Sequence, residues 1–439
     1  MGIIKTIIFV LIFFQSIFVK SQTIKDTIAI EGDLYIEHVV NVGESLKKIA
    51  KMYNVRVKDI INANEMSGKL YYNQILYIPF QSKDNSKSIN LINKLTNKFD
   101  DIKKEEIHIA LLMPYYIIKN DTMFNGFEDT TKIPFIYYNL SDVALSFHIG
   151  VELAVDSLRR SGKRIYMSSY DTNNDSLKTS HIVNSGVLDN MDIIIGPLHA
   201  NNFTVLCEKY GNNTDKIIIN PLSRITDNVA KYKSVYQIST PNKEQAMIIK
   251  NKVLRSYKNK KVMIMYNQKE KGLASYFQHL FKKENQRVSF IDIEHTHVDS
   301  VRRYFDNFQI VILPSSNHAF VTKMLASIGG IDSTSIVFGL DIWKNYENLD
   351  VEDLMEVDVH FPVYNIFDYK NSHDRAFLTL FENEYNTNQG KYTHIGYNII
   401  MHFCSDFKSF FFKRFNNGGK INIRAPLYHY IDYELTPVN

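Results

Sequence analysis

The sequence predicts an α/β protein with two parts, a small βααβ module followed by a large region of alternating strands and helices. The first observation is a compact segment at 35–80 with a strand-like run at each end and two helical patterns between them. The second is the region from residue 107, where short β-branched runs alternate with longer amphipathic segments, as in parallel sheets with crossover helices. The chain has 439 residues, 45% of them hydrophobic, which is enough for more than one core.

The N-terminal residues 1–22 are predicted to be a signal peptide. Lys5 supplies positive charge, residues 6–19 are uncharged and rich in Ile and Phe, and polar residues follow. A membrane-spanning helix needs about 20 apolar residues, so this stretch is short for a span. We expect cleavage near Gln22; a retained N-terminal anchor is the alternative. No Cys lies near the boundary, so lipid attachment is not expected, and the mature protein is predicted to lie in the periplasm or cell envelope.

Charge and cysteine content exclude some classes of protein. The net charge is +4, from 51 basic and 47 acidic residues, and no long basic run could follow a phosphate backbone, so nucleic acid is not an expected partner. Cys207 and Cys404 both lie in apolar, helix-like segments and are predicted to be small buried thiols, with a disulfide as the alternative.

The segment at 35–80 has the order strand, helix, helix, strand. Its strands are predicted at 35–40 and 74–80. Glu44 or Ser45 is suited to cap the first helix. The apolar residues at helical spacing are Leu46, Ile49, Ala50 and Tyr53 in the first helix and Val57, Ile60 and Ile61 in the second.

This module resembles the LysM domain over essentially its whole length. The start of the family pattern appears as GESL at 43–46, the Asn that ends its second helix is Asn64, and its closing motif appears as NQILYIP at 73–79. Asn73 replaces the usual turn Gly, a mild departure because Asn also tolerates positive φ.

LysM domains bind glycans that contain N-acetylglucosamine, so the resemblance implies peptidoglycan as a partner. The groove lies between the loop entering the first helix and the loop leaving the second. Leu46 and Leu70 could instead belong to the core, and a LysM module that has lost binding and acts as a spacer is the alternative. The implied groove residues are Gly43, Glu44, Ser45, Leu46, Met66, Ser67, Gly68, Lys69, Leu70 and Tyr71.

A polar linker at 81–106 follows the module. Its beginning, 81–88, is typical of a solvated connector. Apolar residues then recur every three or four positions between Ile89 and Ile102, which predicts an amphipathic helix in the second half of the linker.

The large domain at 107–439 contains two sets of strands and helices joined near Thr240. This division predicts two lobes, one at about 107–240 with C-terminal segments that return to it, and one at about 241–365. The first set has strands at IHIALLM, RIYMSSYD, DIIIGP, KIIIN and SVYQIS, with helices at 143–160, 176–188 and 199–210. The second set has strands at KVMIMY, VSFIDI, QIVILP, SIVFGL and VDVHFPV, with helices from 242, at 272–283 and at 318–328. Two further helices are predicted at 373–385 and 392–412.

The large domain resembles the type I periplasmic binding proteins, such as the Leu/Ile/Val-binding proteins. The resemblance is carried by the helix and strand FHIGVELAVDSLRRSGKRIYMSSYDT, by DIIIGPL, IIINPLS, YQISTPN and FGLDIW, and by HIGYNIIMHF, in which Asn398 replaces the family's Asp. The opening LLMP and the YDTNND segment resemble the envelope branch of this fold, which includes outer-membrane activators of peptidoglycan synthases.

In this fold a ligand lies where strand ends of both lobes face the cleft. Amino-acid-binding members place hydroxyl residues at two of these ends, and most of those hydroxyls are missing here. Arg224 could pair with a ligand carboxylate, while each candidate could also be a solvated loop residue or a helix cap. The candidate residues are His199, Asn201, Asn202 and Ser223 with Arg224 from the first lobe, and Asp341 and Trp343 from the second.

Catalytic motifs are absent from the sequence. It contains no Gly-x-Ser-x-Gly elbow, no His-Glu-x-x-His helix and no Gly-rich phosphate loop. His295 and His297, flanked by Glu294 and Asp299, are the only close His pair, and a polar strand end explains them better than a metal site without an evident third ligand. The sequence therefore predicts no enzyme activity, no cofactor and no metal site.

Together, these features predict a non-enzymatic protein that binds peptidoglycan and whose large domain senses a small ligand or docks on an envelope or wall-synthesis protein. The alternative is the substrate-binding component of an ABC importer for amino acids or small peptides.

Overall fold

The computed structural model divides the chain into two compact units, 1–100 and 101–439. The predicted signal peptide, the predicted helix in the linker and the pair His295 and His297 lie outside the described residues. Within the described ranges, every helix is too short or too polar to cross a lipid bilayer. The described residues are 27–30, 33–40, 44–53, 55–64, Met66, Gly68, Leu70, 75–79, 105–124, 137–258, 260–293, 302–305, 309–346, Leu349, 351–369 and 371–438.

The small unit is a three-stranded antiparallel sheet with two helices. The chain runs through β1 (Thr27–Ile30), β2 (Asp33–Val39), α1 (Leu46–Tyr53), α2 (Val57–Ala63) and β3 (Ile75–Pro79). The sheet order is β1-β2-β3. The predicted βααβ order is confirmed, and β1 is an additional strand whose four residues are too few to give a clear periodicity in the sequence.

The core of the small unit comes from the apolar residues that the helical spacing picked out. Ile49 and Ile60 are fully buried between the helices and the sheet, and they pack with Leu76 and Ile78 of β3. Because residues three or four apart share one face of a helix, these short helices each present an apolar face to the strands.

The first sheet of the large unit has the order β14-β15-β8-β7-β6-β4-β5, with parallel pairing everywhere except between β14 and β15. Side chains alternate across it, since Ile109 and Leu111 of β4 pack on one face and Ala110 and Leu112 on the other. Its strands are β4 (Glu106–Met113), β5 (Arg164–Asp171), β6 (Ile193–Ile195), β7 (Ile217–Asn220), β8 (Val235–Gln237), β14 (Phe412–Arg414) and β15 (Lys420–Asn422).

The second sheet has the order β10-β9-β11-β12-β13-β16-β17 and is parallel up to β13. The last two strands pair in the antiparallel sense. Its strands are β9 (Val262–Tyr266), β10 (Val288–Asp292), β11 (Ile310–Ile312), β12 (Ile336–Phe338), β13 (Val359–Pro362), β16 (Leu427–Ile431) and β17 (Glu434–Pro437).

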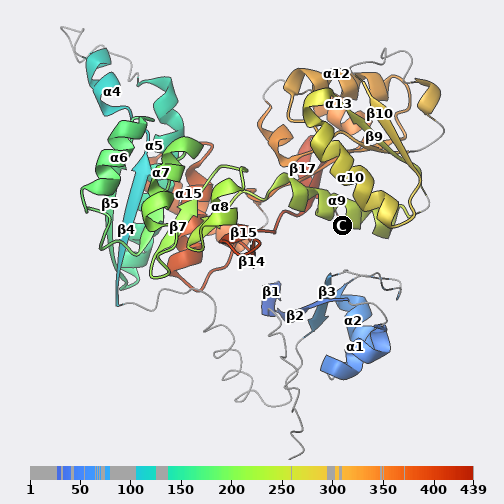
Figure 1. Cartoon of the computed structure of the whole chain (residues 1–439), viewed down its shortest axis with the longest axis horizontal. Helices are drawn as coiled ribbons and strands as arrows, with labels where there is room; N and C mark the ends of the chain where they lie inside the picture. Colours follow the sequence, from blue (N-terminus) through green and yellow to red (C-terminus); the bar gives the residue numbers. More distant parts are fainter. Residues whose placement is uncertain are drawn as a thin grey trace, which may run out of the picture. The chain divides into compact units, whose positions relative to one another are not determined.

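Helices cover both faces of each sheet, as the alternation of strands and helices predicts (Figure 1). The first sheet carries α5 (Asp142–Arg160), α14 (Ser372–Tyr385) and α15 (Thr393–Cys404) on one face, and α6 (Ser176–Asn184), α7 (Ala200–Tyr210) and α8 (Asp227–Lys231) on the other. The second carries α9 (Asn242–Ser256) and α10 (Lys271–Lys283) on one face, and α12 (His318–Gly329) and α13 (Val351–Glu356) on the other. The short helix α4 spans Ile117–Phe124, and 3-10 turns span Asn139–Ser141, Gln268–Glu270, Arg302–Tyr304 and Asp341–Asn345.

Two glycines allow α5 and α15 to approach closely. A Cβ at Gly150 would lie 1.8 Å from the carbonyl oxygen of Thr393, and one at Gly396 would lie 2.4 Å from the carbonyl oxygen of Phe147. The glycines of the HIG motifs at 148–150 and 394–396 are therefore packing residues.

The C-terminal part of the chain contributes to both lobes. The helices α14 and α15 and the strands β14 and β15 belong to the first lobe. The predicted helix at 392–412 is too long, because α15 ends at Cys404 and Phe412 begins β14. The strands β16 and β17 then add an antiparallel edge to the second sheet, and these two strands were not predicted.

Candidate functional site

In the small unit, Asn64 fixes the end of α2 to β3. Its side-chain amide donates to the carbonyl oxygens of Ile60, at 2.8 Å, and Tyr77, at 2.6 Å, and its Oδ1 accepts the Tyr77 N–H at 2.7 Å. These three bonds replace backbone pairing where the helix ends and so hold the start of the following loop in place.

The loop that enters α1 is held by two neighbouring residues. Ser45 Oγ accepts the backbone N–H of Lys48 at 3.3 Å, which is the helix cap expected from the sequence. The Glu44 carboxylate contacts His38 Nε2 at 2.7 Å, and the Tyr53 hydroxyl lies 2.9 Å from His38 Nδ1. Burial, with a smaller contribution from Glu44, raises the pKa of Tyr53. Glu44 is thus turned toward an internal hydrogen-bond chain.

Of the two segments expected to form the glycan groove, the described residues Leu46 and Gly68 lie close together. A Cβ at Gly68, whose φ is +89°, would lie 3.9 Å from Cδ1 of Leu46. Leu46 is only 8% exposed and belongs to the core, whereas Met66 and Leu70 are half-buried at the edge of the core. The remaining expected groove residues, Gly43, Ser67, Lys69 and Tyr71, lie outside the described residues.

In the large unit, the charges expected at the cleft bind each other. Arg224 follows β7 in the first lobe, and Asp341 follows β12 in the second. The Nε of Arg224 donates to both oxygens of Asp341, at 2.9 and 3.1 Å, and its Nη2 donates to Oδ2 at 2.9 Å. Asp341 is completely buried, and its backbone N–H donates to Gln245 Oε1 at 3.1 Å. The carboxylate that Arg224 binds therefore belongs to the protein itself.

Aromatic and basic side chains surround this ion pair. Burial lowers the pKa of Lys344 to about 8, while its Nζ donates to the carbonyl oxygen of Asn365 at 2.6 Å. The same ammonium lies 5.3 Å from the centre of the Tyr364 ring. Burial also raises the pKa of Tyr346 to about 12, and its hydroxyl donates to the carbonyl oxygen of Ser316. These groups are held by protein contacts.

The other candidate cleft residues divide into structural and exposed positions. Asn202 is buried and bonds to Ser176 and Asn174, so it joins α7 to the start of α6 and the turn before it. Trp343 is 2% exposed and donates its Nε1–H to the Ser315 carbonyl oxygen at 2.8 Å.

His199 is the residue before α7, and burial lowers its pKa. Ser223 accepts the Ile225 N–H in a turn, and Asn201 is exposed. The structure therefore brings Arg224 and Asp341 together but does not bring the whole predicted set around one point.

A separate hollow of about 490 Å³ lies at the carboxyl ends of β4 and β5. Asp171 at its base is a structural anchor, because it accepts backbone N–H groups from Tyr115, Tyr116 and Asn173 and the ammonium of Lys178. The residues that line it are Tyr115, Ile117, Asn120, Asp121, Tyr137, Leu145, His148, Ile149, Ser169 and Asp171.

Comparison with known proteins identifies the small unit. The family model of the LysM domain matches residues 38–79. Residues 38–79 are a LysM domain. The match begins near the end of β2 and ends with β3, and Asn64, which joins α2 to β3, lies inside it. A comparison with curated proteins finds no match.

Solved structures show the fold of the large unit. A putative branched-chain amino acid ABC transporter protein from Rhodospirillum rubrum aligns with a TM-score of 0.57 and 10% identity, over 76% of this chain and all of that one. A substrate-binding protein from Desulfitobacterium hafniense in complex with Leu gives 0.51 and 15%, with the same coverage.

Full-length LpoA from Haemophilus influenzae gives a TM-score of 0.51 and 12% identity, over 79% of this chain and 61% of LpoA. The large unit thus has the two-lobed type I periplasmic-binding-protein fold. At these identities the likeness concerns the fold alone.

Both cysteines have the properties expected of buried thiols. Cys207 and Cys404 are free and buried. Burial raises the pKa of Cys404 to about 12 and also raises that of Cys207. A thiolate is the nucleophilic form, so neither residue is prepared for nucleophilic catalysis.

Proposed function

We propose that this protein binds peptidoglycan through its LysM domain and that its two-lobed unit is a non-enzymatic module that docks on envelope or wall-synthesis machinery. The LysM domain and the binding-protein fold together suggest a location in the periplasm or cell envelope. The proposal rests mainly on one observation: the LysM domain and the two-lobed fold occur in one chain, and Arg224, the expected ligand-binding arginine, is already paired with Asp341.

For the glycan site, we propose that backbone groups of the two loops meet acetamido groups and that exposed parts of Met66 and Leu70 cover sugar faces. Glu44 and Leu46 then hold the loops in place, because one is bonded to His38 and the other is in the core. The other proposed contacts are Gly43, Ser45, Ser67, Gly68, Lys69 and Tyr71.

Sedimentation with insoluble peptidoglycan tests this proposal. We expect the mature chain to sediment with the polymer and a chain without residues 27–80 to stay in solution. Met66→Gln should weaken retention several-fold, whereas Met52→Gln, on an exposed face of α1, should not. Equal retention of the full and shortened chains would contradict glycan binding by the LysM domain.

For the two-lobed unit, the ion pair argues against a free amino-acid site. In such a site a ligand carboxylate would have to displace Asp341, which is buried and held by three hydrogen bonds from Arg224. Losing a buried charge pair costs several kcal/mol. We therefore propose that a protein partner, and not a free amino acid, is the target of this unit.

Co-purification from cell envelopes, followed by mass spectrometry of proteins and small molecules, tests this part. We expect an envelope or wall-synthesis protein to be retained by the chain that lacks residues 27–80, which separates docking from glycan binding. Hydrolysis of purified peptidoglycan that one point mutation abolishes would contradict the non-enzymatic assignment.

The second candidate is the substrate-binding component of an ABC importer, which the likeness to the Leu-bound protein favours. Calorimetry with Leu, Ile and Val separates the two functions. We expect no heat of binding for the intact chain, and micromolar affinity would favour the importer function over docking.

A further inference from the structure

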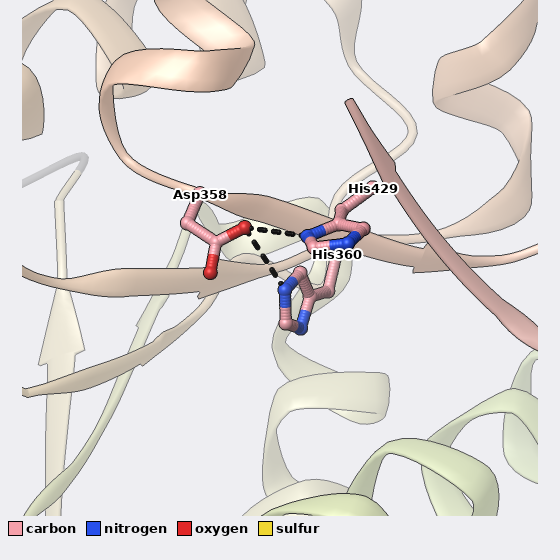
Figure 2. A group of neighbouring side chains, drawn as sticks. All are labelled: Asp358, His360 and His429. Carbon is pink, nitrogen blue, oxygen red and sulfur yellow. Dashed lines mark hydrogen bonds and ion pairs between the residues drawn. The ribbon is translucent and has the colours of Figure 1, made fainter. Parts of the chain in front are cut away.

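The second sheet brings together three side chains that the sequence does not place side by side. His360 of β13 and His429 of β16 are directly opposite each other in the antiparallel pair, so both rings lie on the same face. Asp358 precedes His360 by two positions and has a left-handed backbone with φ +41°. Figure 2 shows the Asp358 carboxylate turned toward both imidazoles.

The contacts among these residues are short. Oδ1 of Asp358 lies 3.0 Å from Nε2 of His360 and 2.8 Å from Nδ1 of His429. The three potential ligand atoms all lie within 4.8 Å of one another, and the two rings are nearly perpendicular, with centroids 4.8 Å apart. Ring nitrogens and a carboxylate oxygen therefore converge on one point.

The cluster has a buried side and an open side. His360 is 1% exposed, and the Phe338 ring packs against it at 5.1 Å. The Asp358 side chain is 44% exposed and that of His429 is 17% exposed. An ion and a water molecule could thus reach the carboxylate side while the other side stays dry.

Packing alone does not explain two histidines at this register. In the sheet His360 lies beside Phe338 and His429 beside Thr436, and His360 Nδ1 has no hydrogen-bond partner in the described part of the chain. A buried polar atom without a partner costs free energy, and well-packed apolar residues often stabilise as much as buried charged groups or more. Two imidazoles at these positions therefore lower the stability of the sheet relative to apolar residues, which favours a role in binding.

We propose that Asp358, His360 and His429 form a site for a first-row divalent transition metal ion, with Zn²⁺ as the best match. Neutral imidazoles and a carboxylate are zinc ligands, and a tetrahedral ion at about 2.0–2.1 Å from each ligand separates neighbouring ligand atoms by about 3.3 Å. The two Asp358 contacts must lengthen by a few tenths of an ångström, and the two ring nitrogens, which lie within 4.8 Å of each other, must approach by up to about 1.5 Å. A water completes the coordination.

Among the charges around the site, the Asp358 carboxylate is the group that attracts a cation. Lys252, on the packed helix α9, opposes a positive ion, and Tyr257 follows the same helix. The ion would join β16, which arrives from the first lobe, to β13 of the second sheet. Metal binding should therefore stabilise the edge of the second lobe.

Titration of the tag-free mature chain with Zn²⁺, followed by calorimetry, tests the proposal. We expect one Zn²⁺ site per chain and tetrahedral absorption bands with Co²⁺. Zn²⁺ should also raise the midpoint of urea unfolding, followed by the fluorescence of Trp343, which is the only Trp of the chain and a core residue of the second lobe. Asp358→Asn and His429→Gln should each weaken Zn²⁺ binding about tenfold or more. His279→Gln, at an exposed histidine, is the matched control and should bind normally.

Two controls keep the test decisive. Circular dichroism without metal identifies a variant that fails to fold, and Asp358→Asn, at a half-exposed position, remains informative if His429→Gln does not fold. The proposal is overturned if the intact chain does not bind Zn²⁺ or if folded Asp358→Asn binds it normally. Loss of binding in a His295→Gln/His297→Gln double variant would also overturn it, because the ion would then lie at that pair.

Discussion

The two candidate binding regions differ in how their residues are brought together. In the LysM domain, Asn64 and Ser45 hold the loops that we propose bind glycan, through contacts within a short stretch of chain. In the two-lobed unit, the decisive contact joins Arg224 to Asp341 from separate lobes. A site made of neighbouring residues keeps its motif visible in sequence, whereas a site made from distant residues can change its chemistry while the fold is preserved.

The largest expected effect comes from breaking the distant pair. Arg224→Ala leaves a fully buried carboxylate unpaired and should lower the free energy of unfolding of the large unit by about 3–5 kcal/mol. Asp341→Ala should cost less, because the Arg224 side chain is 25% exposed and water can reach it. Urea unfolding followed by Trp343 fluorescence measures both.

A double variant sharpens this prediction. Arg224→Leu/Asp341→Leu should recover much of the lost stability, because neither charge then remains alone. If Arg224→Ala and Asp341→Ala were both within about 0.5 kcal/mol of the unaltered protein, the ion pair would not hold the lobes and the cleft would be free to accept a carboxylate.

Removing the Asn64 hydrogen bonds should destabilise the LysM domain nearly as much. Asn64→Ala removes three hydrogen bonds, two of them to backbone groups of Tyr77, which should cost the LysM domain about 2–3 kcal/mol. Hydrogen exchange of peptides covering 55–64 should quicken, while peptides of the large unit stay unchanged. Unaltered exchange would show that β3 holds the loop without Asn64.

A smaller loss is expected at the helix cap. Ser45→Ala removes the acceptor for the Lys48 N–H and should destabilise the LysM domain by about 1 kcal/mol. Ser45→Asp, which keeps an acceptor, should restore most of this stability and is the matched variant. Hydrogen exchange of peptides covering 44–53 distinguishes the Ser45→Ala variant from the Ser45→Asp variant.

Sequence patterns predicted the fold more completely than the sites. Apolar runs such as IHIALLM at 107–113 and the helical spacing of Leu46, Ile49 and Ala50 report local burial, so most of the elements and the core of the LysM domain followed from them. The crossing of β16 and β17 into the second sheet could not follow, because strand partners depend on distant pairing.

The same limit applies to side chains far apart in the chain. Arg224 and Asp341 were both candidates, but their mutual bond was not predictable from either neighbourhood. His429 gave no signal, since its significance depends on lying opposite His360. The predicted pocket tryptophan, Trp343, is a core residue because its indole N–H has a backbone acceptor inside the second lobe.

The smallest expected effect concerns a disulfide between Cys207 and Cys404, which are free thiols in the structure. Cys207 packs in the core on one face of the first sheet and Cys404 in the core on the other face. A disulfide needs Cα atoms within about 7 Å of each other, which a sheet lying between two helices prevents. Dithiothreitol should therefore leave the thermal midpoint unchanged, and both thiols should react with a thiol reagent only after denaturation. A lower midpoint under reducing conditions would show that the thiols are paired and that the packing of α7 and α15 on opposite faces is wrong.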